Sequence, residues 1–298
     1  MSDPLPKVIL RLIRQIIFWP LEALLVFILF GTARILPVAI ASVCMGLVMS
    51  LLGPLTPWHK RARRNLVYAM PHLSYAKQSQ ILRGMWMNLG RVIGEYPHIN
   101  KLVDKGYVEF IGQEHIRDVE TGGFLISAHM SNWELGPFAA RSVGKKVAAI
   151  YRPLNNPFLA GLLARRQRTF GGEMFPKGRE AALGMISAIR KKQFMCLLID
   201  QKLREGMAVP FFGHPANTPI GHIKVAIKKK VPIFYVQMVR ISGCHFRLTI
   251  SPVIDLPDHD DDDSVLEAAT AINKTIEDWI TQHPEQWFWP HRRWTKDI

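Results

Sequence analysis

Two long apolar stretches near the amino terminus constrain this chain more than any other feature of its sequence. The first runs from Gln15 to Ala33 and is interrupted by only three polar residues, and the second, from Ile35 to Trp58, has no charged residue. A membrane-spanning helix needs about 20 mostly apolar residues, and both stretches are close to that length. The apolar region continues directly into a basic cluster rather than into a cleavage site of small residues, which disfavours a signal peptide. We therefore expect a membrane anchor, either one span with an interfacial stretch or a hairpin of two.

Basic residues stand on both sides of these stretches. Those before are Lys7, Arg11 and Arg14, and those after are Lys60, Arg61, Arg63 and Arg64. Positive charge collects on the cytoplasmic side of membranes, so this pattern fits a hairpin but leaves the orientation of a single span open. In the second stretch, small residues at helical spacing (among them Ser42 and Gly46) favour close packing against another helix.

The whole chain is also basic, with 38 Lys and Arg against 24 Asp and Glu and a net charge of +14. Such a charge indicates anionic partners, which here means a membrane surface, a phosphorylated ligand, an acidic protein or nucleic acid. The aromatic residues do not alternate with the basic runs and no nucleic-acid motif is present, so we predict no nucleic-acid partner. The three cysteines are far apart, and neither a metal-ligand spacing nor a nucleotide-binding motif occurs, so no metal or cofactor is expected.

From Tyr107 onward, short β-rich runs alternate with helical ones. This alternation predicts an α/β fold with a mixed central sheet flanked by helices, and a division into an anchoring region, 1–60, and a catalytic domain, 61–298. The expected strands lie at 107–111, 123–128, 146–151, 194–199, 232–240 and 245–252. The expected helices lie at 74–97, 134–144, 157–170, 180–191, 221–230 and 264–282.

One polar stretch after the apolar run Phe124-Leu125-Ile126 is the strongest candidate for chemistry. It contains His129 and Glu134 and precedes a helical pattern. Ligands of open α/β sheets bind where strands end and helices begin. An imidazole titrates near neutral pH and can act as a general base, and a carboxylate can hold its tautomer. We predict His129 as the base and Glu134 as its partner.

The spacing of this pair requires a particular local structure. Residues five apart do not share a helix face, so the two meet only if His129 lies in the turn before the helix. Ser131 to Glu134 matches the S-x-x-E capping box, which predicts Ser131 as the N-cap. The same pattern leaves open an interpretation in which Glu134 is only a cap residue.

Motifs along the whole chain resemble those of the bacterial late lipid A acyltransferases, within the lysophospholipid acyltransferase superfamily. The resemblance rests on the apolar amino terminus and on the motifs Ala62-Arg63-Arg64-Asn65-Leu66, His129…Glu134, Tyr151-Arg152-Pro153, Lys177-Gly178-Arg179, Ile199-Asp200-Gln201, Val209-Pro210-Phe211-Phe212-Gly213 and Pro284-Glu285-Gln286-Trp287-Phe288-Trp289-Pro290-His291-Arg292-Arg293-Trp294. Asp200-Gln201 departs from the Asp-His-Asp of several members.

This resemblance implies a membrane enzyme with an acyl carrier protein as donor and the phosphorylated, acylated precursor of lipid A as acceptor. It places the enzyme at the bacterial inner membrane, with the catalytic domain on the cytoplasmic face. Because no Ser or Cys is placed as a convincing covalent nucleophile, we expect direct transfer to a hydroxyl without an acyl-enzyme. An acyltransferase of the same superfamily that acts on a lysophospholipid, an ornithine lipid or a glycolipid is the alternative. Basic clusters at 165–168, 190–192 and 228–230 offer docking surfaces for an acidic carrier, although such clusters are more often solvated faces.

Three further residues are predicted to bind substrate. Arg152 and Arg179 follow expected strands, where a guanidinium can grip phosphate with two hydrogen bonds. Asp200 ends an apolar run and is either hydrogen-bonded structure or part of the site. For the carboxy-terminal Trp287, Trp289 and Trp294, with Arg292 and Arg293, we expect a membrane interface, with a packed tail as the alternative.

Overall fold

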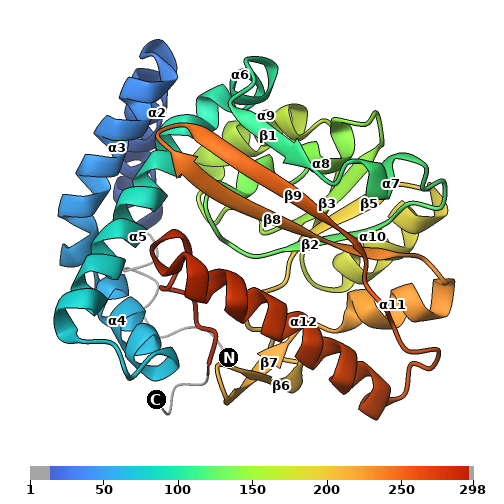
Figure 1. Ribbon diagram of the computed structural model, residues 1–298. Helices are drawn as coiled ribbons and strands as arrows, with labels where there is room; N and C mark the ends of the chain where they lie inside the picture. The colour runs from blue at the N-terminus through green and yellow to red at the C-terminus, as the bar shows by residue number, and fades with distance from the viewer. Residues whose placement is uncertain (1–13, 295–298) are drawn as a thin grey trace, which may run out of the picture.

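The computed structural model describes residues 14–294, apart from the side chains of Arg14, Leu163 and Ala164. Of the predicted basic flank before the apolar region, Lys7, Arg11 and the side chain of Arg14 lie outside the described residues. A seven-stranded sheet forms the centre, with helices on both of its faces (Figure 1). The predicted fold class, a mixed sheet flanked by helices with an apolar helical segment at the amino terminus, is confirmed.

The strand order is β1-β9-β8-β2-β5-β3-β4, and every neighbouring pair is parallel except β8 and β9, which are antiparallel. Its strands are β1 Val108–Ile111, β2 Gly123–Ser127, β3 Val147–Tyr151, β4 Glu173–Pro176, β5 Phe194–Leu198, β8 Ile233–Ser242 and β9 His245–Val253. A separate antiparallel hairpin consists of β6 Met207–Phe211 and β7 His214–Thr218. The six predicted strands are present, whereas β4, β6 and β7 were not predicted.

The helices lie close to the predicted ranges, apart from the segment after His129. The longer ones are α2 Trp19–Ile35, α3 Val38–Leu52, α4 Pro57–Ala69, α5 Tyr75–Glu95, α9 Ala160–Phe170, α10 Arg179–Arg190, α11 Gly221–Lys229 and α12 Asp262–Gln282. The short ones are α6 Ile99–Asp104, α7 Glu114–Arg117 and α8 Phe138–Arg141, with a π-helical turn, η1 Arg14–Phe18, and 3-10 turns η2 Gly53–Leu55, η3 Tyr96–His98, η4 Trp133–Leu135, η5 Pro157–Leu159 and η6 Pro284–Gln286.

The central strand β2 shows why the sheet is covered on both sides. All five of its residues are buried, as expected of a parallel strand between two helical layers. Phe124 and Ile126 belong to the core cluster that includes residues of α4, α5, α11 and α12, whereas Leu125 belongs to the cluster with α6 and α8. Successive side chains of a strand point to opposite faces, so this one strand contributes to both cores.

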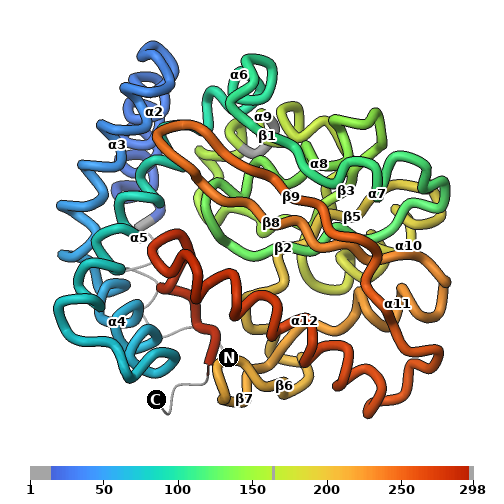
Figure 2. The backbone as a smooth tube through the Cα atoms, in the orientation of Figure 1, coloured from blue at the N-terminus to red at the C-terminus, as the bar shows by residue number. Residues whose placement is uncertain are grey.

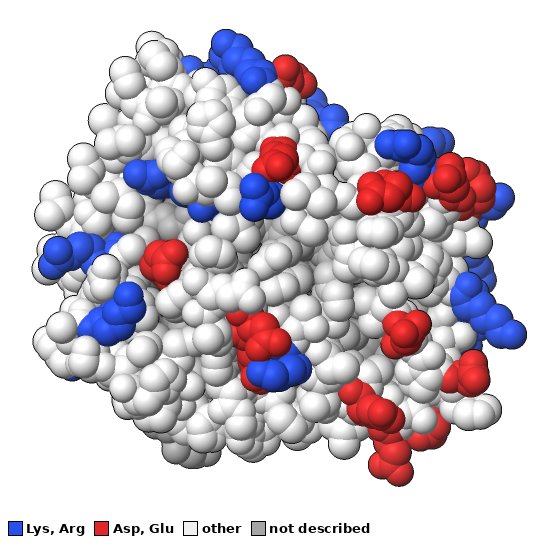
Figure 3. All heavy atoms as spheres, viewed as in Figure 1, with Lys and Arg blue, Asp and Glu red and all other residues white. Residues whose placement is uncertain are grey.

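The apolar region forms two helices that are each long and apolar enough to cross a membrane. The spans of this kind are Gln15–Ile35 and Val38–Leu55, of which only 11% and 22% are buried. α3 carries no charged residue, and the surface of α2 and α3 is largely white in Figure 3, where charged side chains are coloured. Their outer faces are therefore apolar and uncovered by the described protein.

The inner face of α3 packs closely on α5. A Cβ added to Gly90 would lie 2.1 Å from the carbonyl oxygen of Met45, and one added to Gly94 would lie 2.4 Å from that of Ala41. Ser42 and Gly46 are buried on the same face, as the small residues of this stretch predicted. The boundary predicted at residue 60 falls inside α4, so the apolar helices and the sheet domain share one packed structure.

The segment after α12 returns to lie beside α5 (Figure 2), where Gly84 contacts Glu285. Trp287 and Trp289 are fully buried and Trp294 is 5% exposed, as part of the core. Arg293 is also buried, donates to Thr218 Oγ1 at 2.9 Å and stacks on Phe211. The membrane-interface prediction for these tryptophans is wrong. The chain instead uses them to close its core over the end of the sheet.

Candidate functional site

The site begins with two neighbouring strands that end at the same level. Ser127, the last residue of β2, pairs with Leu198, the last residue of β5. His129 and Asp200 each lie two residues further on, so the parallel register brings them together across 71 positions of sequence. His129 Nδ1 lies 2.7 Å from Asp200 Oδ1, and the backbone N–H of His129 donates to Asp200 Oδ2 at 2.9 Å.

Asp200 is a completely buried carboxylate held by three hydrogen bonds. The third comes from Trp287, whose indole Nε1–H donates to Oδ2 at 2.7 Å. Burial by itself would raise the pKa of Asp200. The positive charge of His129 when it is protonated and its hydrogen bonds, with a contribution from protonated His291, outweigh burial and hold that pKa well below its usual range. Asp200 therefore stays ionised at neutral pH.

The ionised Asp200 determines which nitrogen of His129 carries a proton. A carboxylate can only accept, so Nδ1 is the protonated nitrogen and Nε2 keeps its lone pair. The side-chain Nε2 of Gln201 lies 3.0 Å from His129 Nε2 and can donate to it. The imidazole side chain is 16% exposed, so an incoming hydroxyl that displaces Gln201 can reach the free lone pair. This arrangement suits a general base.

A second histidine lies against this pair. The ring centroid of His291 is 4.6 Å from that of His129, and His291 Nε2 is 3.9 Å from Asp200 Oδ2 without a hydrogen-bond partner among the described residues. Burial, followed by the neighbouring positive charges, lowers the pKa of His291 to about 3, so it is neutral at neutral pH. The three side chains have potential metal-ligating atoms within 4.8 Å of one another, but hydrogen bonds from the protein already satisfy Asp200.

Glu134 does not make the contact with His129 that the sequence predicted. Its two oxygens accept from Arg166, Oε1 from Nη2 at 2.8 Å and Oε2 from Nε at 3.1 Å. Both nitrogens of His129 face other residues instead. The carboxylate that holds His129 is therefore Asp200, and Glu134 joins Arg166 of α9 to the loop that carries His129.

The predicted capping box is not formed either. Ser131 has a positive φ of 51°, and its buried hydroxyl has no partner among the described residues. The N-cap of the short turn η4 is Asn132, and the helix expected at 134–144 is reduced to η4 and α8. The loop bends sharply at Ser131 instead of entering a helix directly.

Residues far away in the sequence hold this loop. The backbone N–H of Ser131 donates to the carbonyl oxygen of Gln286 at 2.9 Å, and the backbone N–H of Phe288 donates to the carbonyl oxygen of His129 at 3.0 Å. Between these two bonds, Met130 forms a β-bridge with Trp287. The carboxy-terminal segment thus forms one wall of the site, supplying Trp287 and His291.

A buried carboxylate holds the loop from the opposite side. Glu95, at the end of α5, is fully buried and accepts from Asn132 at 2.9 Å, from Ser42 of α3 at 2.6 Å, and from two guanidinium nitrogens of Arg240. A buried charge of this kind is stable only when it is paired and hydrogen-bonded. The loop, the apolar helix α3 and strand β8 therefore meet at a single residue.

Arg152 and Arg179 lie at the same edge of the sheet but apart from the base. Lys177 follows β4 and donates its backbone N–H to Tyr151 at the end of β3, which places both segments at the carboxyl edge. Both arginine side chains are exposed and form no hydrogen bond or ion pair with described residues. They remain accessible to a ligand.

A large cleft of about 1010 Å³ opens beside two side chains that contact His129. Gln201 and His291, which both contact the base, line it, together with Asn65 and Trp294. We call this cavity the basic cleft because its lining contains seven cationic residues. They are Lys60, Arg61, Arg64, Lys177, Lys202, Arg204 and Arg292. The basic residues after the apolar region are visible in the sequence, but no local pattern there links them to the site.

A partly accessible histidine paired with a buried carboxylate, at the carboxyl edge of a sheet and beside a cationic cleft, is an arrangement suited to an α/β enzyme that binds anionic substrates. Comparison with known sequences gives the reaction. The profile of the family described as bacterial lipid A biosynthesis acyltransferase matches residues 9–296. The chain belongs to this family, and its chemistry is acyl transfer.

Individual relatives agree with this assignment. The chain is 27% identical to a lipid A biosynthesis acyltransferase of Haemophilus influenzae, over 80% of this chain and 79% of that protein. It is 28% identical to the lipid A biosynthesis lauroyltransferase of Escherichia coli, over 78% of each. It is also similar to a phosphatidylinositol mannoside acyltransferase of Mycobacterium tuberculosis, at 22% identity over 78% of this chain and 66% of that protein.

Proposed function

We propose that this protein transfers a fatty acyl group from the thioester of an acyl carrier protein to a hydroxyl of the phosphorylated, acylated precursor of lipid A. The pairing of His129 with Asp200 beside the basic cleft is the observation that carries this proposal. The family supports the acceptor class, and the net charge of +14 suits an acidic carrier and an anionic lipid.

In the proposed reaction, the acceptor hydroxyl takes the place of Gln201 at His129 Nε2. His129 removes the hydroxyl proton as the oxygen attacks the thioester carbonyl, and Asp200 stabilises the imidazolium without taking up a proton. The carbon–sulfur bond then breaks, and the thiolate leaves with the proton from Nε2. An ester forms, a thioester is consumed, and no acyl-enzyme is needed.

Other predicted residues have supporting roles in this proposal. Glu134 acts as a positioning residue, because its pair with Arg166 fastens the His129 loop to α9. Arg152 and Arg179 bind substrate at the carboxyl edge, where their guanidinium groups are free of described protein partners. The basic clusters at 165–168, 190–192 and 228–230 are surfaces for the carrier, although Arg166, Lys191 and Lys228 already pair with carboxylates of this chain.

We place the protein at the bacterial inner membrane with its sheet domain on the cytoplasmic face. The uncovered apolar faces of α2 and α3 support attachment, because such surfaces are unfavourable in water. The basic residues that follow the apolar region support the cytoplasmic side.

The likeness to the mannoside acyltransferase favours a second candidate, acyl transfer to another glycolipid. Mass spectrometry of products separates the two. The purified full chain is incubated with acyl carrier protein loaded with chains of different length and with a panel of acceptors: the lipid A precursor, a phosphatidylinositol mannoside and a lysophospholipid. A mass increase of one acyl group on the lipid A precursor alone is expected. Acylation of another acceptor, but not of this precursor, would contradict the proposal.

A further inference from the structure

Glu95 joins the apolar helix α3 to the active-site loop, residues 129–134, through the two oxygens of one carboxylate. Ser42 of α3 donates to Oε1 at 2.6 Å, and Asn132 of the loop donates to Oε2 at 2.9 Å. All three side chains are buried, so water does not readily take the place of a lost partner. Because the carboxylate is a rigid planar group, a movement of Ser42 would be passed on to Asn132.

The active-site loop needs support from outside because its backbone is bent into an uncommon conformation. Ser131 has a φ of 51°, a left-handed value that persists in a residue other than glycine only where the surroundings hold it. The side chain of Asn88 donates to the carbonyl oxygen of Ser131 at 3.0 Å, which is one such contact. His129 lies only two residues before this bend, so a shift of the bend changes the alignment of His129 with Asp200.

Ser42 is not needed to satisfy the charge of Glu95. Arg240 donates to both oxygens of the carboxylate, from Nη1 to Oε1 and from Nη2 to Oε2 at 3.0 Å. The sulfur of Cys244 lies a further 3.9 Å from Oε1. Without the serine hydroxyl, the carboxylate therefore keeps its counter-ion and a donor at each oxygen. What the hydroxyl adds is the position of the carboxylate relative to α3.

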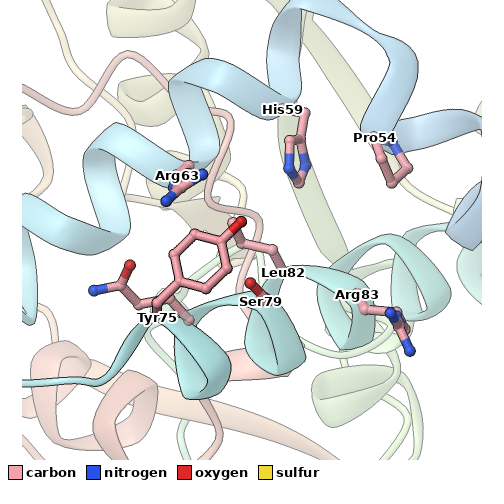
Figure 4. A pocket seen from close by; sticks show the side chains of 8 residues that line it. Pro54, His59, Arg63, Tyr75, Ser79, Leu82 and Arg83 are labelled. Atoms are coloured by element: carbon pink, nitrogen blue, oxygen red, sulfur yellow. The ribbon is translucent and has the colours of Figure 1, made fainter.

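The helix α5, which carries Glu95, packs differently on its two neighbours α4 and α3. Between α5 and α4 lies a cavity of about 190 Å³, where Arg63 stacks on the exposed ring of Tyr75 (Figure 4). Against α3 there is no such space, because a Cβ added to Gly94 would lie 2.4 Å from the carbonyl oxygen of Ala41. On both helices this close contact is adjacent in sequence to the serine–glutamate hydrogen bond. The helix α3 is therefore seated without slack at the residues that lead to the loop.

We propose that Ser42 of α3 is a positioning residue for the active site. It acts through Glu95 on Asn132, and the loop then keeps the imidazole of His129 aligned with Asp200. The rate of the reaction therefore depends on how the apolar helix is seated against α5. The inference rests on the proposed function, because it takes His129 as the base.

The test removes the serine hydroxyl and asks whether its effect requires the loop. The variants are Ser42→Ala, Asn132→Ala and the double variant. Ser50→Ala is the control, because Ser50 belongs to the same helix but its hydroxyl donates to the carbonyl oxygen of Leu47 in that helix, at 2.8 Å. The full-length proteins are compared in detergent for the kcat and KM of acyl transfer, at a temperature where denaturation curves show each of them to be folded.

We expect kcat to fall at least about fivefold in Ser42→Ala and further in Asn132→Ala, with the KM for donor and acceptor unchanged, because a misplacement of about 1 Å costs about a hundredfold and the remaining contacts of Glu95 limit the shift. The double variant should match Asn132→Ala within about twofold, because Ser42 then has no path to the loop. Ser50→Ala should keep the kcat of the unaltered protein.

A second measurement reports on His129 without any turnover. Nitrogen NMR of proteins labelled at histidine distinguishes the two tautomers of a neutral imidazole. The signals of His129 are identified by their absence in His129→Gln. The share of the tautomer with its proton on Nδ1 should fall in Ser42→Ala and in Asn132→Ala, because the hydrogen bond to Asp200 loosens. It should be unchanged in Ser50→Ala.

Three kinetic outcomes overturn the inference. A kcat of Ser42→Ala equal to that of Ser50→Ala would show that the hydroxyl has no part in positioning. An equal loss of kcat from Ser42→Ala with and without Asn132→Ala would show that it acts by another path. A raised KM with unchanged kcat would assign Ser42 to substrate binding.

Failure of the proposed function gives a different result. In that case the unaltered protein transfers no acyl group, or His129→Gln is as active as the unaltered protein. The tautomer of His129 then decides alone, and equal shares in Ser42→Ala and Ser50→Ala would refute the role of Ser42.

Discussion

Replacing Asp200 by Asn tests the central feature of the site with minimal change in shape. Asp200 accepts two hydrogen bonds from His129 and one from Trp287. An Asn side chain presents an NH₂ group where one of these donors requires an acceptor, so His129 is released or forced into the other tautomer. With Nε2 protonated, His129 cannot accept the proton of the acceptor hydroxyl.

The expected loss is large. We expect kcat to fall at least about a hundredfold, the usual contribution of a general base in its correct state. At about 1.36 kcal/mol per factor of ten, this adds about 2.7 kcal/mol to the barrier. Stability should fall by about 1–3 kcal/mol, because donors buried around position 200 lose their acceptor.

The assay is acyl transfer at saturating donor and acceptor, with far-UV circular dichroism to confirm folding. Asp255→Asn, which removes the same charge at an exposed position, serves as the control and should be nearly as active as the unaltered protein. A folded Asp200→Asn protein with kcat within about fivefold of the control would refute the role of Asp200, because a base deprived of its partner loses far more.

Three further predictions concern the pairing of Glu134, the effect of pH on stability, and the membrane. Glu134→Gln and Arg166→Gln should lower turnover to a similar extent, and the turnover of the double variant should be little lower still, because the two side chains act as one unit. If Arg166→Gln keeps near-normal turnover while Glu134→Gln is inactive, Glu134 acts directly and not through Arg166. Burial lowers the pKa of His222 from 6.5 to about 4. Between these two pH values the unfolded chain therefore binds more protons at His222 than the folded chain does. As a result, the free energy of unfolding falls as the pH falls through this range. His222→Leu should reduce this slope by up to about 1.4 kcal/mol per pH unit in denaturant titrations, and an unchanged slope would contradict it. The full chain should fractionate with membranes and need detergent for extraction, whereas recovery in the soluble fraction without detergent would contradict attachment by α2 and α3.

Most of the fold follows from patterns within short segments of sequence. The helix expected at 74–97 corresponds to α5, and it begins where Ser74 Oγ accepts from the backbone N–H of Lys77 as the N-cap. The strands that were missed are weak in such patterns: β4 is a half-buried edge strand of four residues, and β6 and β7 each contain a proline.

The site was harder to predict, because its contacts depend on tertiary structure. The place of His129 after an apolar run identifies it from the sequence, but Glu134, the nearest acidic residue in sequence, is not its partner. The actual partner is set by the register of β2 against β5, and Trp287 and His291 arrive from the other end of the chain. Asp200 stands out in the sequence because it ends an apolar run. The signal that would identify it as the partner of His129 is the adjacency of β2 and β5 in the sheet.

The contribution of the carboxy-terminal segment has a consequence for the time at which the enzyme becomes active. Ribosomes synthesise proteins from the amino terminus, so α2 and α3 are available for membrane insertion long before residues 286–291 exist. Until those residues emerge, the loop at His129 lacks its contacts with Gln286 and Phe288, and Asp200 lacks the hydrogen bond from Trp287. Under the proposed attachment by α2 and α3, a nascent or prematurely terminated chain therefore reaches the membrane before the site around His129 is complete.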